Sequence, residues 1–236
     1  MSVNTRLQGI YAISDEILTP YEILSQCVES ALKAGVRIFQ LRDKSHSDEW
    51  LCPIAKELLK LCERYNALFV LNDRLDLALR LNAPALHIGR DDGEFSRVRE
   101  RFSGILGASS YGDLQRAKVL ESLGADYVAF GAFFPSPTKP NAAAAPLELL
   151  IQAKQTLKIP ICAIGGISTQ NIHLLKNADM NAVINSLWAN NSQDSSTLES
   201  THTNSTHTES SHIESTLQNR LDSITHNAKA LQQCCK

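Results

Sequence analysis

The chain has 236 residues, of which 43% are hydrophobic and 20% are charged, and its formal net charge is −2. This length and apolar content allow one large domain with a substantial core, and the near-neutral charge gives no indication of a nucleic-acid partner. No apolar run approaches the length of a membrane span, and the first residues lack the pattern of a secretory signal.

The cysteines favour a reducing compartment. Six are present, and four of them are scattered through apolar segments, whereas Cys234 and Cys235 are adjacent. Adjacent cysteines rarely suit a structural disulfide or a zinc site. We therefore predict free thiols in a cytoplasmic protein, without a membrane or nucleic-acid partner. The sequence gives no indication of the oligomeric state.

Short apolar runs recur along the chain, and each ends in glycine or in polar residues. Runs of this length are typical of buried strands. The predicted strands are 9–14, 36–41, 68–71, 85–88, 104–108, 127–130, 159–164 and 182–184.

The segments between these runs carry apolar residues at helical spacing. The predicted helices are 19–35, 50–62, 75–81, 95–102, 113–123, 146–157, 168–175 and 217–231. The first begins with Thr19-Pro20-Tyr21-Glu22, which has the form of a capping box with proline at the first helical position.

Eight alternations of strand and helix predict an α/β fold with parallel strands and crossover helices. At this length the count favours a single-domain (β/α)8 TIM barrel. An open doubly wound sheet is the alternative. It usually has fewer strands and often a glycine-rich first turn, which is absent here.

Residues 190–212 differ in composition from the rest, since they are nearly all Ser, Thr, Asn, His and acidic residues. Such a segment cannot bury enough apolar surface to offset chain entropy, so we predict a disordered insertion. Its histidines (His202, His207 and His212) could instead bind a metal, but a five-residue spacing does not place them on one helical face. The predicted organisation is a barrel over 1–189, the insertion, and over 213–236 either the eighth barrel helix or a detached helix that binds a partner.

The loop after the predicted strand 127–130 has the composition of a phosphate-binding loop. Pro135 and Pro137 forbid both helix and ladder there. Ser136 lies between the two prolines, and Thr138 and Lys139 follow them, so the loop carries two hydroxyls and a cation. A stiff backbone with such side chains suits a phosphorylated ligand.

Polar residues collect at the carboxyl ends of nearly every predicted strand, which form one rim in a barrel. They are Gln40, Arg42, Lys44, Asn72, Asp73, Asp92, Ser109, Ser136, Thr138, Lys139 and Asn185, with Gly165 and Gly166. Three cations and two carboxylates facing one space are compatible with Mg²⁺ joined to a polyphosphate, because Mg²⁺ prefers hard oxygen ligands.

Each of these residues also has a structural interpretation. Gln40, Arg42 and Lys44 could be a solvated charge run, although an extended chain places all three on one side. Asp73 could pair with Arg74 on the surface, and Asp92 could cap a helix. The Gly165-Gly166 pair could be either a tight turn or a close backbone approach to a phosphate. His87, inside a strand, is predicted to support the site and not to bind the ligand itself.

Several motifs together resemble thiamine-phosphate synthase in their order and spacing, over roughly residues 9–186. They are QLRDK (40–44), LND (71–73), HIGRDD (87–92), LGAS (106–109), GADYVAFGAFFPSPTK (124–139) and AIGGI (163–167). The resemblance implies a (β/α)8 barrel and a transferase. Its reaction joins hydroxymethylpyrimidine diphosphate to a thiazole monophosphate, or to the carboxylated precursor of that thiazole, and releases diphosphate.

The resemblance also implies roles for particular residues. The pyrimidine diphosphate would be held by Gln40, Leu41, Arg42, Asp43, Lys44, Asn72, Ser109 and Lys139, of which Arg42, Lys44, Ser109 and Lys139 would act in catalysis. Mg²⁺ would be bound by Asp73 and Asp92. The thiazole phosphate would be held by Ser136, Pro137, Thr138, Gly165, Ile184 and Asn185.

This chain departs from the family pattern at three residues, and the insertion at 190–212 also lies outside that pattern. Ser136 stands where the family usually has Thr, and Asn185 where it often has Ser, with Ser186 adjacent. Tyr111 stands where many members have His, so no histidine base is expected there.

The resemblance and the residues together predict a dissociative substitution, because cations are plentiful and a nucleophile–base pair is absent. Two alternatives are a thiazole tautomerase on a related barrel and a non-catalytic protein that binds thiamine phosphate. The first would not need the QLRDK motif, and the second would need neither the paired carboxylates nor the cations.

Overall fold

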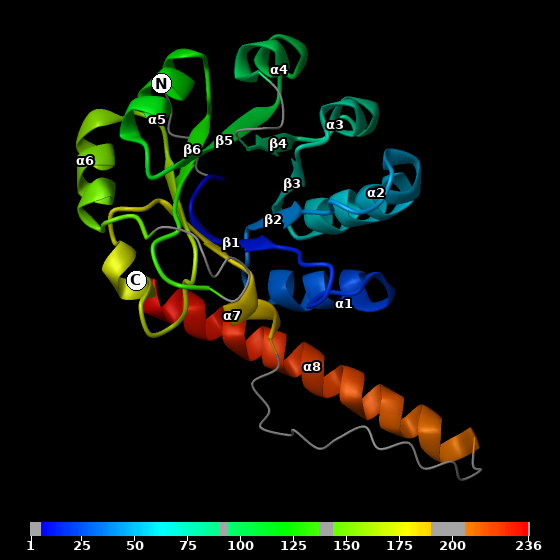
Figure 1. Ribbon diagram of the computed structural model, residues 1–236. Coiled ribbons are helices and arrows are strands. Elements are labelled where there is room, and N and C mark those ends of the chain that lie inside the picture. Colours follow the sequence, from blue (N-terminus) through cyan, green and yellow to red (C-terminus); the bar gives the residue numbers. More distant parts are fainter. Residues whose placement is uncertain (1–5, 90–93, 137–143, 190–205, 236) are drawn as a thin grey trace.

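The computed structural model describes residues 6–89, 94–136, 144–189 and 206–235, without the side chains of 206–213. Within these residues, eight parallel strands form a closed barrel in chain order, and β1 pairs with β8 to complete it (Figure 1). The strands are β1 (Gly9–Ile13), β2 (Ile38–Leu41), β3 (Leu68–Asn72), β4 (Ala85–Ile88), β5 (Ile105–Tyr111), β6 (Tyr127–Phe130), β7 (Ile161–Ile164) and β8 (Met180–Val183). The predicted (β/α)8 barrel is confirmed, and the open sheet is excluded.

Helices surround the barrel and cover the outer face of its strands (Figure 1). They are α1 (Tyr21–Lys33), α2 (Asp48–Arg64), α3 (Leu75–Leu81), α4 (Phe95–Arg101), α5 (Leu114–Ser122), α6 (Glu148–Thr156), the 3₁₀ helix η1 (Ile172–Leu175), α7 (Asn185–Trp188) and α8 (Thr206–Cys234). None of the helices in the described part of the chain is long and apolar enough to cross a membrane.

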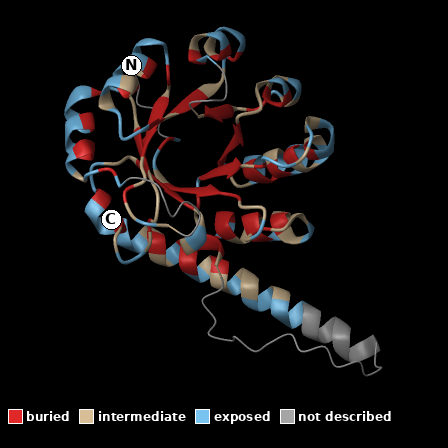
Figure 2. Cartoon of the chain, viewed as in Figure 1, coloured by how far each residue is buried: buried red, intermediate tan, exposed pale blue. Residues whose placement is uncertain are grey.

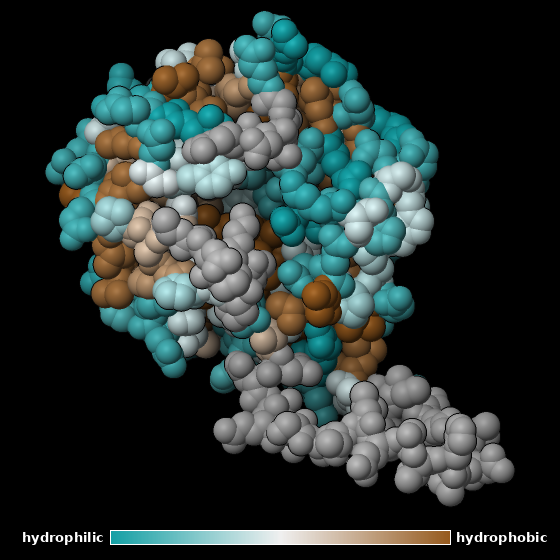
Figure 3. Space-filling view, in the orientation of Figure 1, coloured by the Kyte–Doolittle hydropathy of each residue, from teal (hydrophilic) through white to brown (hydrophobic). Residues whose placement is uncertain are grey.

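The apolar residues form two layers because side chains alternate along each strand. In β3, Leu68 and Val70 belong to a cluster inside the barrel, whereas Phe69 and Leu71 pack outward against the helices. Figure 2 shows the resulting buried barrel inside a ring of half-exposed helices, and Figure 3 shows hydrophilic residues over much of the outer surface in the same view. The same alternation decides which residues at the strand ends face the barrel interior.

Two local predictions were wrong. Thr19 does not cap α1, because its hydroxyl donates to the Asp15 carbonyl (2.7 Å) and accepts from the Asp15 amide (3.1 Å) in the preceding turn. Pro20 takes the N-cap position, without a side-chain hydrogen bond. The predicted seventh helix is reduced to the 3₁₀ turn η1, since Asn171 accepts from the Ser168 amide (2.8 Å) and holds the chain in a tight loop.

The last helix, α8, docks on the barrel. Ile224, Ala228 and Leu231 are fully buried on its inner face, and Asn227 Nδ2 donates to the Leu187 carbonyl (3.2 Å). Figure 1 shows α8 lying along α7 and α1 and then extending beyond the barrel. The docked eighth helix is therefore favoured over the detached one. It begins at Thr206, inside the segment predicted as an insertion, while residues 190–205 lie outside the described residues.

All six cysteines are free thiols, as predicted. Cys27, Cys62 and Cys162 are buried in the core. Burial raises the pKa of Cys62 to about 12, so this thiol stays protonated and packs as a small apolar side chain.

Candidate active site

Two adjoining cavities open at the carboxyl ends of the strands. The small cavity has a volume of about 190 Å³ and is lined by polar residues that include Gln40, Arg42, Lys44, Asn72 and Asp73. The large cavity has a volume of about 700 Å³, and most of its wall is apolar or glycine. The two cavities share a wall made of Ser109, Tyr111, Ala129, Ile164, Ala182 and Ile184. Two ligands bound in these cavities would therefore be in contact.

Polar residues at the end of β2 and directly after it line the small cavity from its floor to its rim. Gln40 lies inside the barrel and is only 2% exposed. Arg42 is half-buried, and Lys44 is exposed at the rim. This gradient follows from the strand alternation, because residues two apart face the same side at increasing height. The predicted common direction of Gln40, Arg42 and Lys44 is thus confirmed.

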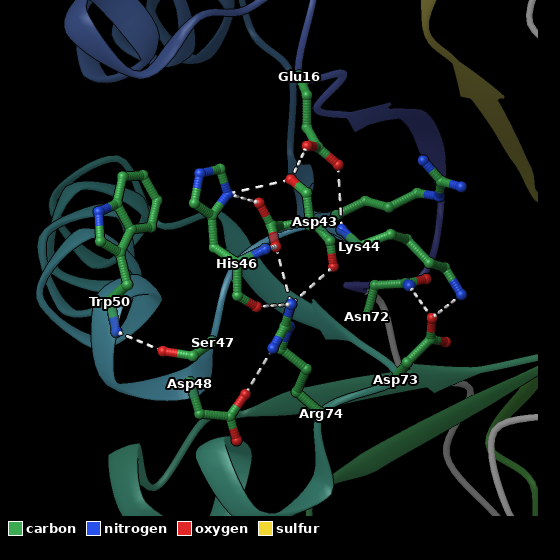
Figure 4. Close-up of polar contacts among 12 residues, drawn as sticks. Glu16, Asp43, Lys44, His46, Ser47, Asp48, Trp50, Asn72, Asp73 and Arg74 are labelled. Carbon is green, nitrogen blue, oxygen red and sulfur yellow. Dashed lines mark hydrogen bonds and ion pairs between the residues drawn. The ribbon is translucent and has the colours of Figure 1, made fainter.

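The end of β3 is a tight turn that projects a carboxylate into the small cavity. Asp73 has a φ of 64°, and its amide donates to the His87 carbonyl at 2.8 Å. Its Oδ2 accepts from Asn72 Nδ2 and lies 2.5 Å from Lys44 Nζ (Figure 4). Asp73 therefore pairs with Lys44 and not with the neighbouring Arg74.

Arg74 instead holds the loop after β2 in place, on the side that faces away from the cavities. Its guanidinium donates to Asp43 Oδ1 (2.8 Å), to Asp48 Oδ1 (2.7 Å) and to the His46 carbonyl (2.7 Å) (Figure 4). Each Asp43 oxygen takes part in two hydrogen bonds: Oδ1 also accepts from the His46 backbone amide, and Oδ2 accepts from the Tyr21 hydroxyl and lies against His46 Nδ1. Burial alone would raise the pKa of Asp43, but the hydrogen bonds from Tyr21 and His46 hold it below its usual range.

This cluster has a structural role. Glu16, Asp43 and His46 bring possible metal ligands within 4.8 Å of one another, but the oxygens of Asp43 are already saturated by donors. Asp43 was predicted to touch the diphosphate, as was Leu41. The Asp43 side chain is fully buried in this cluster, and Leu41 packs in the core outside the barrel. Neither residue is among those lining the two cavities.

A chain of hydrogen bonds crosses the barrel interior beneath the small cavity. It runs from Gln40 through Tyr11, Tyr127 and His87 to Ser109. His87 thus supports a site residue from the core, as predicted. The two tyrosines were missed by the sequence analysis. The available signal was a tyrosine within an otherwise apolar strand, at a position whose side chain faces the barrel interior, as that of Gln40 does.

The large cavity is bounded by a glycine turn and by the loop after β8. Gly165 has a φ of +104°, and a Cβ added there would lie 2.4 Å from the Cβ of Ala132. Only glycine fits this close approach of two loops. The other predicted residues at this cavity are Ser136, Ile184 and Asn185, with Ser186 beside them. Both Asn185 and Ser186 line the wall.

Four predicted site residues lie outside the described residues: Asp92, Pro137, Thr138 and Lys139. The remaining predicted carboxylate fits a hard cation. Asp73 offers an oxygen ligand at a cavity rim that also carries Arg42 and Lys44, which is the kind of donor Mg²⁺ prefers beside an anionic ligand.

Comparison with known proteins agrees with this geometry. The family model described as thiamine monophosphate synthase matches residues 10–187. This chain belongs to the thiamine monophosphate synthase family. The match covers both cavities and all eight strands except the first residue of β1, so the resemblance inferred from the motifs is confirmed, and with it the transferase class.

Individual relatives extend over nearly the same region. The thiamine-phosphate synthase of Wolinella succinogenes is 49% identical over 187 residues, which cover 78% of this chain and 87% of that protein. The thiamine-phosphate synthase of Thioalkalivibrio sulfidiphilus is 43% identical over 188 residues, with 78% and 89% covered. Among solved structures, thiamine phosphate pyrophosphorylase from Pyrococcus furiosus superposes with a TM-score of 0.73 at 28% identity, covering 96% of this chain and 97% of that one.

Proposed function

We propose that the protein condenses hydroxymethylpyrimidine diphosphate with thiazole monophosphate to give thiamine phosphate and diphosphate, or with the carboxylated precursor of that thiazole, in which case CO₂ is released as well. The observation that carries this proposal is the pair of adjoining cavities, one polar and one largely apolar, with a common wall. A condensation needs two substrates held in contact, and such an arrangement supplies most of the advantage of proximity. The free cysteines agree with a cytoplasmic enzyme.

The small cavity is assigned to the pyrimidine diphosphate. Gln40 and Asn72 would hold the ring at the buried floor, while Arg42 and Lys44 at the rim would hold the diphosphate. Ser109, on the shared wall, would face the reacting carbon, and Lys139 would add a further cation. Asp73 and Asp92 would bind Mg²⁺, which when bound adds positive charge beside the leaving diphosphate.

The large cavity is assigned to the thiazole phosphate. Its apolar wall suits the thiazole ring, and the turn at Gly165, together with Ser136 and Asn185, offers polar groups to the phosphate. Pro137 and Thr138 would complete this side. The ring nitrogen would then face the shared wall and the pyrimidine.

The chemical step is a dissociative substitution. The bond between the pyrimidine methylene carbon and the diphosphate oxygen breaks, and its electron pair leaves with the diphosphate. Arg42 and Lys44 stabilise that growing negative charge. The electron-rich aminopyrimidine carries the positive charge, and the lone pair of the thiazole nitrogen then forms the new carbon–nitrogen bond. The residues of this site would position the substrates and stabilise charge, without a covalent enzyme intermediate.

The small cavity also separates this function from the two alternatives. A thiazole tautomerase requires only the large cavity, and a protein that merely binds thiamine phosphate requires no cations for a leaving group. Neither alternative accounts for Arg42, Lys44 and Asp73 gathered at one rim.

The test is diphosphate release, measured with each substrate alone and with both, in the presence and absence of Mg²⁺. We expect release to require both substrates and the metal, with one thiamine phosphate formed for each diphosphate. Folded protein that binds thiazole phosphate but releases no diphosphate would favour the tautomerase or the binding protein.

A further inference from the structure

Gln40 and Ser109, which both line the small cavity, are joined by four consecutive hydrogen bonds. Gln40 Nε2 lies 2.7 Å from the Tyr11 hydroxyl, which lies 2.9 Å from the Tyr127 hydroxyl. Tyr127 lies 3.0 Å from His87 Nδ1, and His87 Nε2 lies 2.9 Å from Ser109 Oγ. The chain thus links β1, β2, β4, β5 and β6 through the barrel interior.

The middle of the chain is enclosed by apolar side chains. Tyr11 is 2% exposed and Tyr127 is fully buried, within the inner cluster of the barrel. Gly107 makes room for Tyr127, because a Cβ at that position would lie 2.0 Å from Tyr127 Cζ. Burial raises the pKa of both phenols well above the ordinary value. Each phenol therefore keeps its single hydrogen and can donate only one hydrogen bond.

These single donors give the chain a direction. The Gln40 amide nitrogen donates to Tyr11, so Tyr11 donates to Tyr127, and Tyr127 donates to His87 Nδ1. A neutral histidine that accepts at Nδ1 carries its hydrogen on Nε2 and donates to Ser109 Oγ. At one end Gln40 keeps its amide oxygen as an acceptor for the cavity, and at the other Ser109 keeps its hydroxyl hydrogen as a donor.

We propose that Tyr11, Tyr127 and His87 are positioning residues that make the small cavity specific for an aminopyrimidine and exclude an oxopyrimidine. An exocyclic amino group would donate to the Gln40 oxygen, whereas an oxo group at the same place would oppose it with a second acceptor. This proposal rests on the proposed function and names the chemical feature that the site selects.

The chain of hydrogen bonds matters because an isolated glutamine does not distinguish an amino group from an oxo group. Its amide can rotate and present either the oxygen or the nitrogen to a ligand. Here rotation of the Gln40 amide would also require both phenols to reorient and His87 to move its hydrogen from Nε2 to Nδ1. The five residues must change together, so the rotation is suppressed.

Specificity can be measured by binding, without turnover. The ligands are analogues of the aminopyrimidine and oxopyrimidine diphosphates in which a methylene group replaces the oxygen between the pyrimidine methylene carbon and the diphosphate. Calorimetry in the presence of Mg²⁺ gives their dissociation constants. We expect wild-type protein to prefer the amino ligand on the order of 100-fold, and the Tyr11→Phe variant to prefer it about tenfold or less. Tyr127→Phe breaks the chain at another link and is expected to behave in the same way.

Tyr65→Phe is the matched control, because it also removes one phenol that donates a hydrogen bond (to Glu29, 2.7 Å), but on the outside of the barrel. Its preference should equal that of wild type. If Tyr11→Phe and Tyr127→Phe both keep the wild-type preference for the amino ligand, the positioning role is overturned and the proposed function is unaffected. Wild-type protein that binds neither ligand would contradict the proposed function as well.

A second measurement uses only the wild-type protein, so it does not depend on whether a variant folds. Long-range ¹H–¹⁵N spectra of the wild-type protein identify the tautomer of each neutral histidine. The proposal requires the Nε2–H tautomer at His87, with and without the amino ligand, and an Nδ1–H tautomer there would overturn it.

Discussion

Lys44 Nζ lies 2.5 Å from Asp73 Oδ2 and so joins the loop after β2 to the end of β3 across the small cavity. Both residues are predicted to meet the diphosphate or its metal. The ion pair orders the rim by joining a cation from one strand end to a carboxylate from the next.

Asp73→Asn should separate turnover from binding. The variant keeps the shape of the turn but removes the charge that Lys44 and Mg²⁺ would share, so we expect turnover to fall about 100-fold or more. Thiamine phosphate should still bind, since most of its contacts are assigned to other residues. The control is Asp76→Asn, which breaks only a surface pair with Arg101 (2.6 Å). An Asp73 variant with normal turnover would contradict the assigned role.

Arg74→Met should loosen the loop that carries Arg42 and Lys44. It leaves the buried Asp43 carboxylate without its guanidinium partner, which should lower the free energy of unfolding by on the order of 3 kcal/mol in urea titrations. The KM for the pyrimidine diphosphate should rise more than that for the thiazole phosphate. Arg80→Met is the matched control, because within the described part of the chain Arg80 donates to the Asp48 carbonyl alone, at the surface (3.0 Å).

The Asp43 cluster should make stability depend on pH in the acid range. The pKa of Asp43 is lower in the folded protein than in the unfolded chain, so protonation favours unfolding. Its contribution is complete above the ordinary carboxyl pKa of about 4 and is lost as the pH falls through the lower, folded value. Subtracting the unfolding free energy of Asp43→Asn from that of wild type isolates this term from the other carboxylates. A difference that does not decrease toward low pH would contradict it.

Gly165→Ala should impair the large cavity. The added methyl group would overlap Ala132, so the turn must shift and the KM for the thiazole phosphate should rise about tenfold or more. Gly9→Ala controls for backbone strain, since Gly9 also has a positive φ (+85°) but no atom lies within 4 Å of the added Cβ. Gly9→Ala should lose roughly 1 kcal/mol of stability from backbone strain, Gly165→Ala should lose more because of the overlap, and only Gly165→Ala should lose affinity for the substrate.

The strand alternation predicted correctly that Gln40, Arg42 and Lys44 share one side. Leu41 and Asp43 were assigned to the ligand only through the family resemblance, because they belong to the same QLRDK motif. The same alternation turns both away from the cavities, and only the fold brings Arg74 close enough to bind Asp43.

The predicted N-cap of the first helix was wrong. Thr19 has the sequence context of an N-cap, but the Asp15 backbone competes for its hydroxyl in the preceding turn. Side chains that can cap a helix can equally close a turn, and the sequence does not reveal which partner lies nearer.

The alternation of strands and helices, the rim on which the polar residues lie, and the family can all be inferred from the amino-acid sequence, because they depend on periodicity and short motifs that extend over a few residues. Other features follow from the folded barrel: the site is two cavities with one shared wall, α8 docks on the barrel, and Gln40 and Ser109 are linked through Tyr11, Tyr127 and His87. Those relationships join residues that are far apart in the sequence, such as Tyr11 and Tyr127, which are 116 positions apart, and only barrel closure brings these two residues within hydrogen-bonding distance.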